Sequence, residues 1–370
     1  MKLTTVFLAG CLQHLPLLDA ILGHPAPALD DARLTGFALH WGDEECAAIL
    51  VPAAGAVTSG LLASLTDEEL AKLDYLQGSF GLHLTEMTVE TSAGPVLAQA
   101  FLPAPEAEVG APWSLADWQP KWADYATALA VEAMGWYGRL GSEGLRIRLR
   151  GIKLRAWARV EIAGHPAGVG HDVKNDVKMS DHHYAYMHYF GFEEATLQFR
   201  RYDGTMSEPM PRSCLATGRA SVILPYDPLR DTVLLVEQFR APLYLAGDPA
   251  PWLWEPVAGM IDPGESPEQA ALREAEEEAG LTIRRLEKAG EAYSSSGSSM
   301  EYCHLFVGLA DLEAAGGVGG LETEGEDIRS KVIPFAELMQ GIDDHGYRDM
   351  PLLVIANWLA RHRDRLRAGM

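Results

Sequence analysis

Three glutamates in a short acidic segment have the spacing of side chains that share one face of a helix. Glu274, Glu277 and Glu278 lie at positions i, i+3 and i+4. The range 262–278 contains seven acidic residues and one arginine, and neighbouring like charges destabilise a helix by about 0.2–0.5 kcal/mol per pair. A solvated acidic face is the simplest interpretation of such a run. The alternative is a site for a hard divalent cation such as Mg²⁺, which prefers clustered carboxylate oxygens and would attract phosphate.

The element that positions these acids is predicted to be a helix between Ser266 and Gly280. Ser266 is a good N-cap residue, Pro267 suits the first helical position, and Gln269 can complete a capping box. Gly280 is placed to end the helix. We expect an apolar face of small residues opposite the acids, formed by Ala271, Leu272, Ala275 and Ala279.

The same segment resembles the Nudix box. It reads Gly259-x5-Glu265-x7-Arg273-Glu274-Ala275-x-Glu277-Glu278-x-Gly280-Leu281, and every specified position matches. Nudix enzymes hydrolyse a nucleoside diphosphate linked to another moiety. The resemblance implies that Glu274 and Glu278 bind Mg²⁺ directly, with Mn²⁺ as a substitute, and that the carbonyl of Ala258 adds an oxygen. It places Glu277 among or next to the ligands, and it implies that Arg273 orients Glu274 or Glu277 through charge-assisted hydrogen bonds.

From about Tyr189 to the C-terminus, the chain resembles bacterial ADP-ribose pyrophosphatases. This implies Mg²⁺-dependent hydrolysis of ADP-ribose to AMP and ribose 5-phosphate. Arg212 and Arg240 would contact phosphates or ribose, because guanidinium groups suit bidentate binding. Tyr189 and Phe190 match an aromatic pair that packs on the adenine, and core packing is the equal alternative. The other positions matched to substrate contacts are Met260, Ser295 and Glu301.

The acidic loop 322–329 is the second region with chemical potential. In the family, this loop supplies the general base and another metal ligand. We expect Glu324 to be the base and Glu326 the ligand, brought in by a mobile loop.

Two departures from the family pattern leave the substrate open. Ser296 stands where a proline is usual, and Thr217 stands where a substrate-side arginine is expected, with Arg219 two residues further on. NADH or a sugar nucleotide is therefore an alternative substrate. A non-catalytic nucleotide sensor is a further alternative, which the complete set of box carboxylates disfavours.

Residues 1–105 resemble the gamma-glutamylcyclotransferase-like fold. The resemblance rests on the segments 6–12 and 73–78 and on Gly60. Active members carry a Tyr-Gly-Ser/Thr-Leu turn, where this chain has Ala9-Gly10-Cys11-Leu12, and a catalytic Glu, where it has Gln77. Because Gln cannot accept a proton as a carboxylate does, we expect no cyclotransfer and a scaffold or ligand-sensing role. The pairing with a Nudix domain resembles tellurite-resistance-associated Nudix proteins.

These patterns predict an α+β protein. Residues 1–105 would form a small β-barrel with helices, 106–185 a helical segment and linker, and 186–370 a Nudix α/β/α sandwich. The strands expected along the chain are 3–9, 47–51, 96–101, 220–225 and 232–238, and the helices are 16–22, a helix capped by Thr66, and 115–138.

Charge clusters before residue 190 have plainer interpretations. Six basic residues fall in the range 146–159, where an anion site is the alternative to the solvated face with an internal acidic partner that we favour. Histidines 171, 182, 183 and 188 are interpreted as surface residues, because no Cys or Glu completes a recognisable ligand set.

Composition narrows the partners. The 370 residues carry a net charge of −22, which repels nucleic acid and anionic lipid, so neither is an expected partner. The sequence contains no run of 18 apolar residues, so no membrane-spanning helix is expected. Cys11, Cys46, Cys214 and Cys303 are widely separated, which indicates free thiols in the cytoplasm. The family resemblance implies a homodimer.

Overall fold

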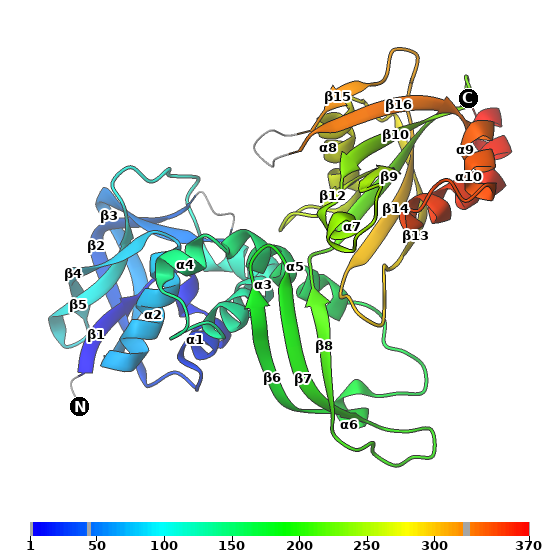
Figure 1. Ribbon diagram of the computed structural model, residues 1–370. Helices are drawn as coiled ribbons and strands as arrows, with labels where there is room; N and C mark the ends of the chain where they lie inside the picture. Colours follow the sequence, from blue (N-terminus) through cyan, green and yellow to red (C-terminus); the bar gives the residue numbers. More distant parts are fainter. Residues whose placement is uncertain (1–2, 43–45, 321–325, 370) are drawn as a thin grey trace. The chain divides into compact units, whose positions relative to one another are not determined.

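The computed structural model describes residues 3–42, 46–320 and 326–369. The chain divides into two compact units, Met1–Ser213 and Cys214–Met370, and Figure 1 labels the elements of both. The α+β class predicted from the sequence is confirmed. The division falls inside the range 186–370, so the sheet strands just before residue 213 are grouped with the first unit.

The first unit begins with a closed β-barrel in the strand order β1-β3-β2-β4-β5. Its strands are β1 (Leu3–Leu8), β2 (Leu29–Trp41), β3 (Ala48–Thr66), β4 (Leu82–Thr91) and β5 (Gly94–Pro103). A 3₁₀ turn (Gly10–Gln13), α1 (Leu15–Leu22) and α2 (Asp67–Ser79) connect them. The predicted cap at Thr66 is confirmed, and Thr66 and Glu69 form a capping box in which each satisfies the other's backbone N–H group at the start of α2.

The rest of the first unit consists of helices and a three-stranded sheet. The helices are α3 (Leu115–Met134), α4 (Ser142–Arg146), α5 (Leu149–Ala163) and the short α6 (Val173–Asp176). The sheet has the order β6-β7-β8, with β6 (Val177–Met187), β7 (Gly191–Phe199) and β8 (Met210–Ala216). Aromatic residues of α3 and α5, including Trp118, Trp122 and Trp157, share one hydrophobic core with the barrel.

The basic segment 146–159 belongs mostly to α5 and differs from the prediction. Arg155 is only 1% exposed and donates to Glu132 of α3, which is equally buried. The expected internal acidic partner therefore exists, but a solvated face is wrong for Arg155. Among the histidines, His182 and His183 lie 2.8 and 2.9 Å from Glu193 and Glu194.

The second unit is built on an eight-stranded sheet within the described residues. Its main path is β13-β14-β9-β10-β16-β15, with β11 paired to β10 and β12 paired to β9. The strands are β9 (Ala220–Asp227), β10 (Thr232–Phe239), β11 (Trp252–Glu255), β12 (Val257–Met260), β13 (Arg285–Tyr293), β14 (Tyr302–Leu309), β15 (Gly317–Gly319) and β16 (Ile328–Pro334). The helices are α7 (Ala241–Leu245), α8 (Pro267–Ala279), α9 (Phe335–Asp343) and α10 (Met350–Ala368).

Alternation along β10 explains why helices cover both faces of this sheet. Val233 and Leu235 pack in a cluster with α9 and α10, whereas Leu234 and Val236 pack in a cluster with α8. The predicted α/β/α sandwich is therefore confirmed, and α8 is held against one face. In the described part of the chain, no helix is long and apolar enough to span a membrane.

Candidate active site

Helix α8 begins and ends as its sequence predicts. The Ser266 side chain accepts from Gln269 N–H, Gln269 caps Ser266 N–H in return, and Pro267 opens the helix. Gly280 ends the helix in the left-handed conformation, with φ of 62°. These local signals fix the start, length and end of the segment that carries the glutamates.

The faces of α8 differ from the prediction. Glu278 is only 2% exposed and lies on the buried side with Ala271 and Ala275, while Leu272 is 41% exposed. Residues seven apart lie two turns along the same side of a helix, so Glu278 follows Ala271 rather than opposing it. A carboxylate is therefore held inside the unit, where an unpaired charge is costly.

Strand β12 meets α8 at the carboxylates. A Cβ on Gly259 would lie 1.7 Å from Oε1 of Glu274, so any larger residue there must displace the Glu274 carboxylate. The backbone N–H of Ala258 donates to Oε2 of Glu278 at 3.3 Å. The predicted ligand set Ala258, Glu274 and Glu278 is thus gathered where strand and helix touch.

Arg273 links the acids of the box. It donates to both oxygens of Glu265 at 3.0 Å, to Glu274 at 2.6 Å and to Glu277 at 3.0 Å. It also donates to the carbonyl of Met260 at 3.0 Å. One guanidinium therefore fixes carboxylates from the loop and from the helix, which is the orienting arrangement expected for Arg273.

Burial raises the pKa of Glu278 to about 8, and the charges of Glu274 and Glu326 add to the rise. Burial also raises the pKa of Glu274 to about 7, against the lowering effect of Arg273 and with further rises from Glu277 and Glu326. Both groups would be stabilised as anions by a cation beside them. This chemistry fits a hard divalent ion. Among the described residues, no group of three or more His, Cys, Asp or Glu side chains is already arranged to hold a metal ion. Glu324, the predicted base, lies outside those residues.

Arg240 has a partner that the sequence reasoning missed. Its guanidinium donates to both oxygens of Glu255, at distances from 2.5 to 3.1 Å. Glu255 is buried on β11, next to β10. Asp349 is nearby, and burial raises the pKa of Asp349 to about 6, with further rises from the charges of Glu255 and Glu301. The two residues meet because β10 and β11 pair antiparallel. A prediction of this strand pairing from the sequence would have placed Arg240 near Glu255.

The other predicted substrate contacts are distributed over both units. Tyr189 and Phe190 of the first unit are exposed and lie edge to face at 4.9 Å, so core packing is wrong for this pair. Arg212 is exposed and donates to the Pro211 carbonyl. In the second unit, Ser295 lies 2.8 Å from Ser298, and Glu301 is half-buried.

Arg219 does not present its guanidinium at the surface. It is buried and lies 2.6 Å from Nε2 of His304, whose pKa burial and the Arg219 charge lower to about 4. Thr217 is also buried, and its hydroxyl donates to the Gly218 carbonyl. The departure at Thr217 is therefore not compensated by an exposed arginine at position 219.

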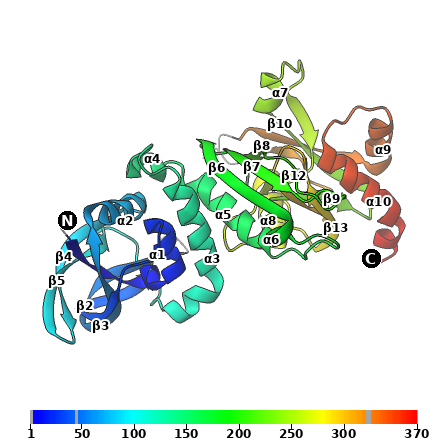
Figure 2. The ribbon, with the colours of Figure 1, turned by 90° about the horizontal axis from the view of Figure 1, so that it is seen from below.

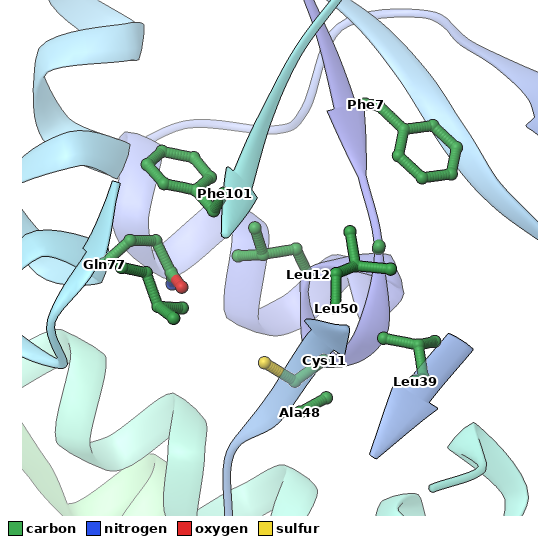
Figure 3. A pocket seen from close by; sticks show the side chains of 10 residues that line it. Phe7, Cys11, Leu12, Leu39, Ala48, Leu50, Gln77 and Phe101 are labelled. Atoms are coloured by element: carbon green, nitrogen blue, oxygen red, sulfur yellow. The ribbon is translucent and has the colours of Figure 1, made fainter. Parts of the chain in front are cut away.

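The barrel contains a small pocket between Cys11 and Gln77. Figure 3 shows both side chains pointing into it among Leu12, Phe101 and Ala48. Its volume of about 20 Å³ holds roughly one water molecule. Burial raises the pKa of the Cys11 thiol, which disfavours the reactive thiolate. The amide of Gln77 cannot accept a proton as a carboxylate does, and the absence of cyclotransfer in this domain stays a prediction.

In comparison with known proteins, two segments of the chain match family models. Residues 216–351 match the NUDIX domain, and residues 6–120 match the gamma-glutamyl cyclotransferase, AIG2-like family. An ADP-ribose pyrophosphatase of Escherichia coli K12 is 36% identical over 194 residues, covering 52% of this chain and 92% of the relative. The corresponding enzyme of Haemophilus influenzae is 34% identical, covering 52% and 89%.

Two further proteins are similar to part of this chain. A GDP-mannose pyrophosphatase of Yersinia enterocolitica is 34% identical over 162 residues, covering 43% of this chain and 83% of the relative. A solved structure described as an ADP compounds hydrolase is 18% identical, with a TM-score of 0.42, and covers 52% of this chain and 97% of that one. With the box complete and relatives matched over nearly their whole length, the chain belongs to the Nudix family.

Proposed function

We propose that this protein hydrolyses the pyrophosphate of ADP-ribose to AMP and ribose 5-phosphate, with Mg²⁺ as the metal and Mn²⁺ as a substitute. The observation that carries the proposal is the pair of partly and fully buried carboxylates, Glu274 and Glu278, at the contact of β12 and α8. The names of the ADP-ribose pyrophosphatase relatives support the choice of substrate.

The residues assigned to the metal are Glu274, Glu278, Glu326 and the carbonyl of Ala258. A bound divalent cation supplies positive charge that neutralises pyrophosphate oxygens and favours attack at phosphorus. Arg273 keeps the carboxylates of Glu274 and Glu277 in place through its hydrogen bonds. This division of labour leaves Arg273 away from the substrate and makes it a positioning residue.

Glu324 is assigned as the general base for the attacking water. Glu277 is assigned a place among or next to the metal ligands. Water attacks one phosphorus, the bond from that phosphorus to the bridging oxygen breaks, and the carboxylate of Glu324 takes the proton. Arg240, oriented by Glu255, donates to the phosphate oxygens of the substrate. Further contacts are assigned to Tyr189, Phe190, Arg212, Met260, Ser295 and Glu301.

A second candidate keeps the chemistry and changes the substrate to a sugar nucleotide or NADH. The burial of Arg219 next to His304 favours considering it, because a substrate-side arginine is then missing at positions 217–219. The GDP-mannose pyrophosphatase relative belongs to this class by name. Comparing kcat/KM for ADP-ribose, GDP-mannose and NADH separates the two candidates.

The first domain is assigned a scaffold role and no cyclotransferase activity. The active protein is assigned as a homodimer in the cytoplasm. Sedimentation of the purified protein tests the dimer. Release of amine from γ-glutamyl compounds would contradict the scaffold role.

The test of the main proposal is AMP release from ADP-ribose with and without Mg²⁺. Glu278→Gln removes the buried charge and keeps the shape of the side chain, while Glu276→Gln changes an exposed glutamate of the same helix. We expect Glu278→Gln to lose at least about 100-fold in kcat and Glu276→Gln to match the wild type. Equal rates for Glu278→Gln and wild type would overturn the metal assignment, and failure on the whole substrate panel would favour a nucleotide sensor.

A further inference from the structure

A short loop of the second unit is tied to the beginning of the C-terminal helix. The loop covers residues 246–251, between α7 and β11, and Arg348 lies just before α10. One terminal nitrogen of Arg348 donates to Oδ2 of Asp248 at 2.5 Å, and the other donates to the Ala250 carbonyl at 2.9 Å. Figures 1 and 2 label both neighbouring helices, α7 and α10, in the second unit. One guanidinium therefore binds two points of the loop, which lie 100 and 98 residues earlier in the chain.

Asp248 shapes this loop from within. Its Oδ1 accepts from the N–H of Ala250 at 2.9 Å, and its own N–H donates to the Leu243 carbonyl at 3.0 Å. The Ala250 N–H and the Arg348 guanidinium lower the pKa of Asp248, so the carboxylate is ionised at neutral pH and both bonds to it are charge-assisted. The loop is thus folded back on α7 and held from outside by Arg348.

The end of the loop sets the backbone of Arg240. The N–H of Arg240 donates to the Pro251 carbonyl at 2.9 Å, directly after Ala250. The Arg240 carbonyl accepts from the N–H groups of Leu243 and Tyr244 at 3.1 and 3.3 Å. Arg240 therefore depends on the loop at its N–H and on α7 at its carbonyl. A shift of the loop end moves the point from which the Arg240 side chain starts.

The guanidinium of Arg240 keeps one end for a ligand. Its Nε and Nη2 donate to Glu255, while Nη1 makes no hydrogen bond to any described residue. The side chain is 37% exposed. Because Glu255 fixes the planar fork, Nη1 can reach a phosphate oxygen only where the backbone places it. The geometry of the backbone at position 240 therefore decides how well this contact forms.

Asp349, next to Arg348, adds a charge near Arg240. Its carboxylate caps α10 by accepting from the Leu352 N–H at 2.8 Å. Burial works against the charge of Arg240, but the hydrogen bonds to Glu255 outweigh it, with smaller contributions from Glu278 and Asp349, so the pKa of Arg240 is raised. The beginning of α10 thus acts on Arg240 in two ways, through the loop and through charge.

We propose that Arg348 is a positioning residue for Arg240, and that the beginning of α10 thereby contributes to binding the diphosphate of the substrate. This role rests on the proposed function, in which Arg240 donates to phosphate oxygens. Arg348 reaches the substrate only through the loop 246–251 and the backbone of Arg240. A displaced loop should weaken binding of the substrate and its transition state alike, which raises KM and leaves kcat unchanged.

A purely stabilising role for the Arg348–Asp248 pair predicts a different outcome. The side chains are 44% and 24% exposed, and ion pairs near the surface contribute little to the stability of a fold. Loss of the pair should therefore leave the protein folded, with an unfolding temperature close to that of the wild type. Its effect should be confined to the loop and to Arg240.

The test compares Arg348→Ala with Arg361→Ala in the full-length protein. Arg361 is an exposed arginine of α10 and has no hydrogen bond or ion pair among the described residues. We expect Arg348→Ala to raise KM for ADP-ribose about fivefold, below the roughly tenfold effect of one whole charge-assisted contact. Its kcat should stay within about twofold of the wild type. Arg361→Ala should match the wild type in both constants.

A second background shows whether Arg348 acts through Arg240. In Arg240→Ala the contact that Arg348 positions is already lost, so adding Arg348→Ala should raise KM no further. Arg348→Lys should recover part of the loss, because an ammonium group can bind Asp248 but cannot span both acceptors as a fork. Asp248→Asn keeps an acceptor for the Ala250 N–H and removes the charge that binds Arg348. It should reproduce the rise in KM, and it takes the place of Arg348→Ala if that variant does not fold.

Hydrogen exchange follows the loop in the absence of substrate. The N–H groups of Arg240, Leu243 and Asp248 are bonded within this segment. They should exchange faster in Arg348→Ala than in Arg361→Ala, because the loop opens more often.

Two results would overturn this role of Arg348. One is an equal KM for Arg348→Ala and Arg361→Ala, whatever their exchange rates. The other is the same rise in KM with and without Arg240, which would show that Arg348 acts elsewhere. If the wild type hydrolyses nothing, the proposed function fails, and the calorimetric affinity for ADP-ribose replaces KM in the same comparisons. Absence of any binding by the wild type would overturn both proposals.

Discussion

Gly259 and Glu274 are packed so closely that a Cβ on residue 259 would lie 1.7 Å from Oε1 of Glu274. The glycine of β12 therefore sets the distance between the strand and the carboxylate of α8. Since Ala258, its neighbour, donates to Glu278, the same stretch of strand touches both buried glutamates. The close contact with Glu274 therefore explains why glycine occupies position 259, the first position of the box.

Gly259→Ala should lower kcat by about 100-fold, because displacement of a reacting group by about 1 Å has an effect of that size. The clash involves a side chain that can move, so the fold should survive with Glu274 displaced. Steady-state rates on ADP-ribose measure the effect. Gly290→Ala is the control, because a Cβ there meets no described atom within 4 Å. Equal activity of the two variants would show that Glu274 needs no fixed position.

Stability of the metal-free protein should fall as the pH rises from about 5 to 8. The pKa values of Glu274 and Glu278 are raised to about 7 and about 8 in the folded protein, above the value of 4.5 for a free glutamate. Between those limits the folded state binds more protons than the unfolded state, so raising the pH favours unfolding. Mg²⁺ should restore stability at pH 8, because it binds the ionised groups.

Thermal unfolding at pH 5.5 and pH 8, with and without Mg²⁺, measures this dependence. The double variant Glu274→Gln and Glu278→Gln is the control and should lose both the metal-free slope and the Mg²⁺ effect. The same pH dependence of stability in the metal-free wild type and in the double variant would contradict the assignment of raised pKa values.

Replacing Arg273 should affect stability as well as rate. Arg273→Ala removes hydrogen bonds to Glu265, Glu274 and Glu277 and leaves their charges uncompensated. We expect about 2 kcal/mol less stability toward urea, the scale of hydrogen bonds to charged groups. Arg273→Lys should recover part of the loss, because an ammonium group cannot reproduce the planar fork. Unchanged stability in Arg273→Ala would show that the acids hold themselves in place.

Glu255→Gln tests whether Arg240 must be oriented. The change removes the charge that fixes the Arg240 guanidinium through hydrogen bonds of 2.5–3.1 Å. We expect KM for ADP-ribose to rise about tenfold, one charge-assisted contact at about 1.4 kcal/mol per tenfold. Glu237→Gln on β10 is the control, because Glu237 pairs with Arg329 instead. A rise in KM with the control alone would contradict the role of Arg240.

Local sequence signals were sufficient for individual elements but not for long-range contacts. The start and end of α8 are set by local contacts, and the roles of Ser266, Gln269 and Gly280 in them were predicted correctly. The burial of Glu278 was missed because the side of a helix that faces the sheet depends on packing, not on charge. The Arg155–Glu132 pair joins residues 23 apart on different helices, and no local pattern specifies which arginine of a basic segment turns inward.

The most direct test of the account is AMP release from ADP-ribose by purified full-length protein, with and without Mg²⁺, for wild type, Glu278→Gln and Glu276→Gln. The account predicts AMP and ribose 5-phosphate in equal amounts from wild type and Glu276→Gln, only with the metal, and at least about 100-fold slower release from Glu278→Gln. Metal-independent release, or undiminished release from Glu278→Gln, would contradict it.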